Sequence, residues 1–222
     1  NREASFKERS RNTQGLIIKD VAIIGSGASG SSAAFHLAKA GRNVVILERD
    51  DTFHKKTCSG GMAASVQNWL PFKLEPVVEE VINKVEFTWQ LEDNVIAELP
   101  GSSPFWIVNR VKLDELIINH AISNGAEIIK PFFVKNIIRK DNLWELISND
   151  QQKIIAKSIV IADGTNSNWA QTFGLGPKSL HRARTISLRV EGRGNIQRGA
   201  TRFEFGLVKY GFAWAFPAND SI

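Results

Sequence analysis

Hydrophobic positions along the chain follow two spacings, and together they predict an α/β protein. An apolar run at 21–24 leads through a glycine turn into a helix of small residues, and a second apolar run at 44–47 ends at Glu48. Short continuous runs of this kind are typical of buried parallel strands. The same pattern predicts a helix that starts after Arg110 and stops at Gly125, followed by parallel strands at 127–129 and 158–162.

Alternating apolar and polar residues predict further strands. They lie at 81–89 and 95–99 with a turn near 92–94, in a meander of 132–139, 143–148 and 153–156, and at 185–190, 202–208 and 212–216; a short helix ends at Pro71. We therefore predict an α/β (α+β two-domain) fold. A Rossmann-like nucleotide-binding domain with a β-meander covers 16–62 and 106–175, an antiparallel-sheet substrate domain covers 63–105 and 176–222, and 1–15 is a disordered basic arm.

The turn after the first strand has the spacing Gly25-x-Gly27-x-x-Gly30. Gly25 allows a tight turn, Gly27 lets the backbone approach a pyrophosphate, and Gly30 lets the helix lie close to the sheet. Ala28 and Ser29 open that helix, whose free N–H groups and partial positive charge favour phosphate. The pattern predicts dinucleotide binding; a glycine turn without a ligand is the alternative.

Glu48 follows the glycines by about 20 residues, where a carboxylate accepts hydrogen bonds from an adenosine ribose. This favours FAD or NAD over NADP, because a 2′-phosphate would meet a negative charge. Arg49 follows directly and weakens that preference, since a guanidinium suits a phosphate.

Composition narrows the class of protein. The single cysteine, Cys58, excludes an internal disulfide and a multi-cysteine metal site and favours a reducing compartment. The four histidines lack metal-ligand spacing, so we expect no metal. No run reaches the ~18–20 apolar residues that span a bilayer, and no signal core stands at the start. We expect a cytoplasmic protein, with peripheral membrane contact as a further option.

Basic residues gather in the last quarter of the chain. Between Lys178 and Lys209, eight Lys and Arg residues stand against two Glu residues. Such a stripe suits an anionic substrate or a phospholipid surface, and a solvated strand face is the plainer alternative. We do not expect nucleic acid as a partner, because no recognition motif accompanies the charge.

Several motifs resemble those of known FAD enzymes. The glycine turn, Arg110 before a helix and the stretch Ile161-Ala162-Asp163-Gly164-Thr165-Asn166-Ser167 resemble enzymes of the p-hydroxybenzoate hydroxylase type. Cys58-Ser59-Gly60-Gly61 resembles the C-x-G-G loop of geranylgeranyl reductases. Residues 210–217, Tyr-Gly-Phe-Ala-Trp-Ala-Phe-Pro, resemble that family's Y-G-W-x-F-P segment, with one extra residue before Trp214. The resemblance spans about 18–217, nearly the whole chain.

The resemblance implies FAD as the cofactor. Arg49 and Val134 join the glycine turn and Glu48 as expected cofactor contacts. The resemblance places Arg110 near the diphosphate and ribityl region, where a bidentate guanidinium suits phosphate. The pair Asp163-Gly164 would bond a ribityl or ribose hydroxyl.

The resemblance also implies a substrate side. Cys58, Gly60 and Gly61 would lie beside the isoalloxazine ring, where glycines clear space for a flat ring and a thiol donates a proton or tunes the flavin. Tyr210, Trp214 and Phe216 would line an apolar tunnel, although packing in a sheet is the plainer interpretation of three aromatic residues.

The implied activity is FAD-dependent reduction of isoprenoid double bonds. The substrate would be an isoprenoid lipid or a prenyl diphosphate, and the electron donor ferredoxin or NAD(P)H. A flavin monooxygenase or halogenase is the alternative within the superfamily, and a truncated, non-catalytic flavoprotein domain is another. The family's later Gly-Asp stretch does not occur before Ile222. We therefore expect either a fragment or a second polypeptide that supplies it.

Overall fold

The computed structural model describes residues 17–52, 58–102, 104–165, 167, 169–176, 182–219 and 221–222. They belong to two compact units, Asn1–Phe53 with Asp114–Leu180 and His54–Leu113 with His181–Ile222. Each unit therefore takes one segment from each half of the chain. The predicted basic arm at 1–15 lies outside the described residues.

The first unit is built on a six-stranded sheet with the order β8-β2-β1-β11-β10-β9. The parallel strands are β8 (Glu127–Ile129), β2 (Val44–Leu47), β1 (Lys19–Ile24) and β11 (Lys153–Ile161). The strands β10 (Leu143–Ser148) and β9 (Val134–Lys140) complete it as an antiparallel meander. All four residues of β2 are buried, because apolar side chains stand on both of its faces. The predicted parallel sheet with a meander is confirmed.

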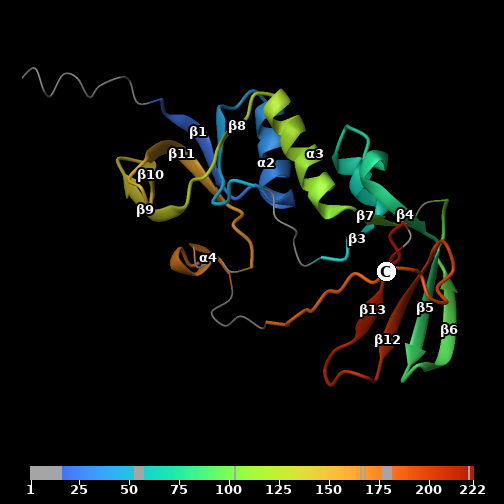
Figure 1. Cartoon of the computed structure of the whole chain (residues 1–222). Helices are drawn as coiled ribbons and strands as arrows, with labels where there is room; N and C mark the ends of the chain where they lie inside the picture. Colours follow the sequence, from blue (N-terminus) through green and yellow to red (C-terminus); the bar gives the residue numbers. More distant parts are fainter. Residues whose placement is uncertain are drawn as a thin grey trace, which may run out of the picture. The chain divides into compact units, whose positions relative to one another are not determined.

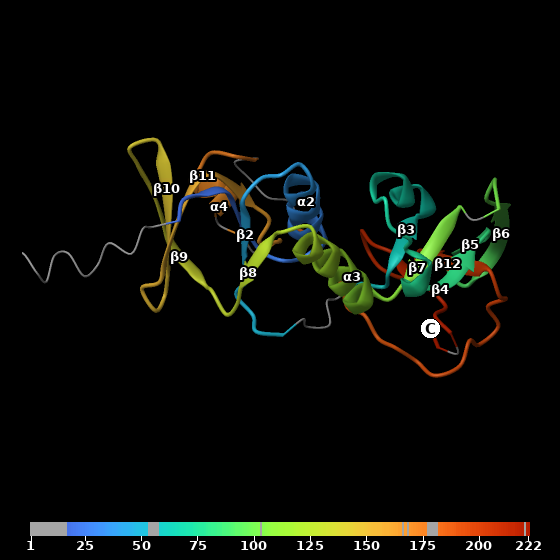
Figure 2. The ribbon, with the colours of Figure 1, turned by 90° about the horizontal axis from the view of Figure 1, so that it is seen from above.

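Two helices lie side by side in this unit (Figure 1; Figure 2). Helix α2 (Ala28–Lys39) packs against β1 and β2 and buries Ala34 and Phe35. The Phe35 ring meets His120 of α3 (Arg110–Ser123) edge-on, with centroids 6.4 Å apart. The predicted stop of α3 is confirmed, since Gly125 adopts φ +101° just after the helix.

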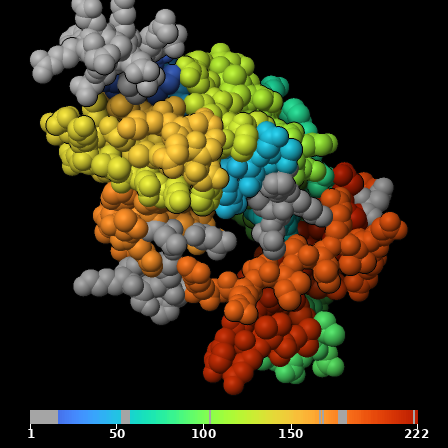
Figure 3. Space-filling model, turned by 60° about the vertical axis from the view of Figure 1, so that its left-hand side comes forward, coloured from blue at the N-terminus to red at the C-terminus, as the bar shows by residue number. Residues whose placement is uncertain are grey.

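Aromatic side chains hold the short helix α4 (Trp169–Thr172) against the meander. On the face in Figure 3, the yellow hairpin β9–β10 lies next to the orange segment that holds α4. Trp144 of β10 meets Phe173 edge-on with centroids 5.5 Å apart, and Trp169 stacks on Phe173 at 6.2 Å. An apolar hollow of about 440 Å³ opens beside these rings.

The second unit holds two smaller sheets. The first has the order β3-β7-β4, from β3 (Gly61–Ala63), β7 (Phe105–Val108) and β4 (Val78–Ile82). The second has the order β13-β12-β5-β6, from β13 (Ala213–Ala215), β12 (Ala200–Phe205), β5 (Lys84–Trp89) and β6 (Glu92–Glu98). Two 3-10 helices, Ala64–Trp69 and Glu75–Val77, connect β3 to β4.

Several predicted elements of this unit differ from the structure. The larger sheet is mixed and not wholly antiparallel, because β12 runs parallel to β5. The helix predicted before Pro71 is strand β3 and a 3-10 helix. The hairpin turns at Gln90 and Leu91, both with positive φ, and not at 92–94. The described segment 182–190 forms no strand, and its Ile186 is 87% exposed. Apolar and polar residues alternate in it as predicted, but no strand of the described residues pairs with it.

The compact units also divide the chain differently from the predicted domains. We assigned the described residues 58–62 and 106–113 to the nucleotide-binding domain, but they cluster with the second unit. The physical reason is backbone pairing: β3 pairs with β7, and the Val108 N–H donates to the Gly60 carbonyl at 3.0 Å.

Candidate functional site

The glycine turn of the first unit is shaped by contacts that admit no side chain. Gly25 adopts φ +98°, and a Cβ there would lie 2.6 Å from the carbonyl oxygen of Ala162. A Cβ on Gly30 would lie 2.0 Å from the carbonyl oxygen of Gly25. Both positions therefore require glycine. The turn packs on the end of β11, which brings Gly25 and Asp163 together, as the motifs indicated.

Helix α2 begins directly after this turn and presents an open N-terminus. Gly27 is its N-cap without a side-chain capping bond, and Ala28 and Ser29 are its first residues. Its first turn contains no acidic residue. The first N–H groups of a helix have no intrahelical partner, so together with the positive end of the helix dipole they favour a phosphate here.

Glu48 holds the turn from the end of β2. One carboxylate oxygen accepts hydrogen bonds from the Ser26 backbone N–H, at 2.7 Å, and from the Ser26 hydroxyl. The other oxygen accepts from the Asp50 N–H at 3.0 Å. We did not predict the role of Ser26, although a hydroxyl residue between the first two glycines was a usable signal. Asp50 pairs with the exposed Arg49 side chain and raises the pKa of its guanidinium.

Asp163 has an acceptor that needs a partner. Its Oδ1 is buried and has no hydrogen-bond partner among the described residues. Gly164 beside it adopts φ +87°, and a Cβ added there would meet no atom within 4 Å outside its two chain neighbours. A buried unsatisfied acceptor costs about 1–3 kcal/mol, so a ligand hydroxyl that donates to Oδ1 would stabilise the site. A ribose or ribityl hydroxyl has this chemistry, and these residues fit a flavin dinucleotide.

Val134, predicted as a cofactor contact, begins β9 and is 6% exposed. Its side chain packs in the apolar core of the unit with Leu146 and Ala156. A contact between Val134 and a cofactor stays a prediction.

The C-x-G-G loop belongs to the second unit. A Cβ on Gly60, which has φ +81°, would lie 2.1 Å from the Val108 carbonyl oxygen. A Cβ on Gly61 would lie 2.5 Å from Cε2 of Phe216 and 2.8 Å from Cζ of Phe105. Packing inside the protein thus requires glycine at position 60 and leaves little room for a side chain at position 61. The exposed Cys58 Sγ accepts a hydrogen bond from Nη1 of Arg110 at 3.1 Å.

The sheet β13-β12-β5-β6 has a polar face that is buried. Glu86 of β5 stands opposite Arg202 of β12, and their side chains form an ion pair at 2.7 Å. Glu204 accepts hydrogen bonds from the Thr88 hydroxyl and from the Leu91 N–H. Both glutamates are only 6% exposed, so this face is closed by its own polar pairs.

The opposite face carries most of a contiguous set of rings, here called the aromatic row, which continues to Phe105 of β7 in the other sheet. Period-two alternation puts Phe87 and Phe203 opposite each other, stacked with centroids 5.9 Å apart. Ring contacts with centroids 5.5 to 6.4 Å apart connect all members of the row: Phe105, Phe216, Phe203, Trp214, Phe212, Phe205 and Phe87. Its first two members touch Gly61, so the structure brings the C-x-G-G loop and the segment with Trp214 and Phe216 together.

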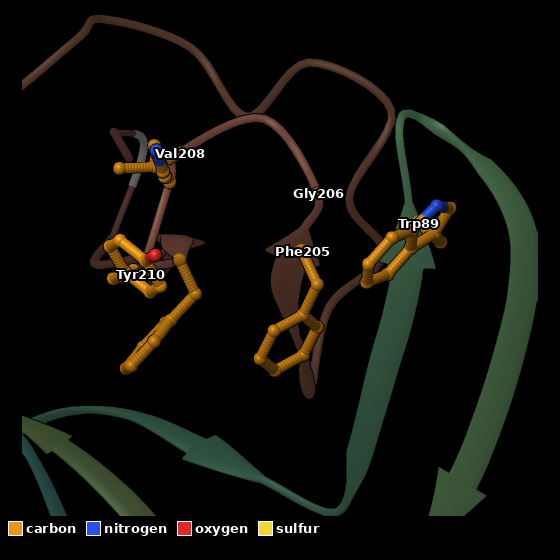
Figure 4. A pocket seen from close by; sticks show the side chains of 8 residues that line it. Trp89, Phe205, Gly206, Val208 and Tyr210 are labelled. Carbon is orange, nitrogen blue, oxygen red and sulfur yellow. The ribbon is translucent and has the colours of Figure 1, made fainter.

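An open pocket of about 530 Å³ lies at the far end of the aromatic row. Phe205 and Phe212 of the row line it, together with Trp89 and Tyr210. Figure 4 shows the Phe205 side chain between those of Tyr210 and Trp89 in that view. Tyr210 is 97% exposed, so it stands at the mouth of this pocket and not inside a closed tunnel.

The described ranges contain no group of three His, Cys, Asp or Glu side chains that could hold a metal ion. No helix in that part of the chain combines the length and the apolar character needed to cross a membrane.

Comparison with known proteins extends this picture. Residues 20–99 match the family described as FAD dependent oxidoreductase. An uncharacterized protein of Methanosarcina barkeri is 28% identical over 91% of this chain and 52% of its own length. Protein FixC of Escherichia coli K12 is 29% identical over 72% of this chain and 40% of its own length. The chain thus spans about half the length, or less, of these curated relatives.

Solved structures share the fold. A geranylgeranyl bacteriochlorophyll reductase-like protein of Thermoplasma acidophilum superposes with a TM-score of 0.78 at 20% identity, over 93% of this chain and 55% of that one. The halogenase PltM, crystallised with phloroglucinol and FAD, gives a TM-score of 0.66 at 17% identity over 91% and 48%. FAD is the cofactor of the matched family, in agreement with the sequence analysis.

Proposed function

We propose that this chain, whose residues 20–99 match the FAD dependent oxidoreductase family, is part of an enzyme that reduces carbon–carbon double bonds of an isoprenoid. The observation that carries the proposal is the aromatic row, which starts at the C-x-G-G loop and ends at an open pocket. An extended apolar chain fits such a surface, because rings offer area for apolar contact without hydrogen bonds that require a partner.

The cofactor would lie against the glycine turn. Gly27 and the first N–H groups of α2 would receive the diphosphate, and Asp163 Oδ1 would accept a hydrogen bond from a sugar or ribityl hydroxyl. The Glu48 carboxylate fixes the turn through Ser26 and keeps lone pairs for the adenosine ribose. Arg110 and its neighbour Cys58 are proposed to act on the flavin side of the reaction.

Reduced FAD, when bound, supplies a hydride to one alkene carbon. The second alkene carbon then needs a proton. Cys58 is the proposed proton donor at Sγ, where the Arg110 guanidinium fixes the position of the sulfur, and water is the alternative donor. The aromatic row would hold the chain in register and exclude water from the double bond. Ferredoxin or NAD(P)H is proposed as the electron donor that reduces the oxidised flavin again after each turnover.

The test uses the natural full-length polypeptide. It should purify yellow and release FAD on denaturation; a colourless preparation that takes up NAD but no added FAD would refute the cofactor assignment. Chemically reduced enzyme is then given geranylgeranyl lipid or diphosphate under anaerobic conditions. A mass gain of two hydrogens per double bond supports the proposal. Oxygen-dependent hydroxylation or chlorination of an aromatic compound, with no alkene reduction, would assign the protein to the monooxygenase or halogenase class.

A pair of variants tests the role of the aromatic row. Trp214→Ala removes a ring of the row and should raise KM or lower kcat for the isoprenoid. Ile186→Ala removes an apolar side chain that is 87% exposed, outside the row, and should change neither. Equal changes of KM and kcat in both variants would show that the aromatic row has no specific role in binding the isoprenoid.

A further inference from the structure

The end of the sheet that carries the pocket is apolar and exposed. Because β5 and β12 are parallel and Trp89 stands opposite Phe205, the turns that follow these strands lie at the same end of the sheet. We call residues 89–91 and 206–212 the apolar tip. Leu91 is 71% exposed and Leu207 is 54% exposed. Turns at sheet ends normally carry small polar residues, so this composition requires an explanation.

We propose that the apolar tip docks on a lipid surface. Trp89 and Tyr210 each combine an apolar ring with one hydrogen-bond donor, the combination that suits the boundary between headgroups and acyl chains. Lys209 is the one charged residue of 206–212, and its ammonium lies 5.3 Å from the centroid of the Tyr210 ring. An ammonium at this position complements lipid phosphate while the neighbouring apolar side chains enter the acyl region.

The charged residues around the apolar tip indicate which net charge the lipid surface has. Glu92 and Asp93 follow Leu91 directly, so a single lysine stands against two nearby carboxylates. Such a tip is not attracted by a strongly anionic surface, and insertion of apolar side chains must supply the affinity. The lipid surface is therefore a zwitterionic one, and binding depends little on ionic strength.

The position of the tip also favours lipid over a protein partner. Phe205 and Phe212 belong both to the pocket at the tip and to the aromatic row. A chain that leaves a lipid layer at the pocket would enter the row without crossing water. This step of the argument rests on the proposed function; the exposure and composition of the tip do not.

Vesicle binding tests the proposal without any turnover. The natural full-length polypeptide is sedimented with sucrose-loaded phosphatidylcholine vesicles at low and high salt. Leu91→Ser with Leu207→Ser should weaken partitioning by about tenfold or more, because two apolar side chains leave the acyl region without a change of charge. The matched control, Ile186→Ser with Leu188→Ser, removes side chains that are 87% and 81% exposed outside the tip and should bind like the parent chain. Circular dichroism verifies that each variant is folded.

A second readout places the tip in the bilayer. Lipids brominated on the acyl chain should quench part of the tryptophan fluorescence of the bound parent chain, and the bound fraction of Trp89→Phe should lack that quenching. Absence of vesicle binding, equal loss in both double variants, or binding abolished by salt would overturn the proposal. Reduction of a short, soluble isoprenoid by a tip variant would then show that the proposed function survives without it.

Discussion

Asp163 offers a test in which stability and ligand affinity should change in opposite directions. In the cofactor-free protein, its buried Oδ1 has no hydrogen-bond partner among the described residues. Asp163→Ala removes this unsatisfied acceptor, so we expect the cofactor-free variant to be more stable than the parent. The same change removes an acceptor for a cofactor hydroxyl, so we expect FAD to bind more weakly.

The magnitudes follow from the local contacts. An unsatisfied buried acceptor costs about 1–3 kcal/mol, which bounds the expected gain in the free energy of unfolding. A hydrogen bond to a charged group contributes about 1.5–3 kcal/mol, so FAD affinity should fall roughly 10- to 150-fold. Asp163 also attracts the Arg49 guanidinium, but that side chain is 65% exposed and the attraction is screened by solvent. The gain should therefore exceed this loss.

The assay pairs urea denaturation of the cofactor-free protein with FAD titration by flavin fluorescence. Asp20→Ala is the matched control, because the Asp20 carboxylate is fully partnered: it accepts from Lys157 Nζ at 2.7 Å and from the Asn43 N–H at 3.0 Å. That variant should lose stability and keep its affinity for FAD. If Asp163→Ala also loses stability without FAD, the acceptor is satisfied in solution and the reasoning is wrong.

Three further predictions concern the packing of the second unit and the loss of stability at acid pH. Gly60→Ala should lower the free energy of unfolding by roughly 2 kcal/mol or more, since it combines φ +81° with a 2.1 Å backbone contact; an unchanged urea midpoint would contradict the geometry. Gly61→Ala should cost about 1–3 kcal/mol by crowding Phe216, and adding Phe216→Leu should recover part of that cost, so strictly additive effects in the double-mutant cycle would exclude the contact. Hydrogen bonds from Lys157 and the Asn43 N–H lower the pKa of Asp20 below 3.8 in the folded protein, so its stabilising contribution is present above that pH and lost as pH falls through the folded pKa. In Asp20→Asn the free energy of unfolding should therefore fall less steeply below about pH 4 than in the parent protein. Equal slopes in both proteins over this pH range would count against the prediction.

The local parts of the fold could be predicted because their causes are local. The spacing of Gly25, Gly27 and Gly30 after an apolar strand fixes the turn and the start of α2, and Gly125 fixes the stop of α3. We missed the hydroxyl partner of Glu48 because spacing alone does not say where a carboxylate points, although a hydroxyl residue stands between the first two glycines. The structure makes Ser26 that partner.

Long-range contacts account for the remaining differences. Gly61 is crowded by Phe216, and Glu86 pairs with Arg202 116 residues later in the chain. No local pattern indicates that β12 lies parallel to β5, since alternation is the same in parallel and antiparallel pairs. The segment 185–190 alternates like a strand, but a strand also needs a neighbour to pair with, which the pattern does not supply.

The way the two units share the chain has a consequence for biosynthesis. Strand β1 ends at Ile24, but one of its two neighbours, β11, is made only at 153–161. Strand β5 likewise waits for β12 at 200–205. During translation both sheets therefore keep an open strand edge while more than 100 further residues are made, which exposes the nascent protein to wrong pairing. High contact order of this kind slows folding, so yield in a cell should depend on chaperones that cover those edges until the late strands emerge from the ribosome.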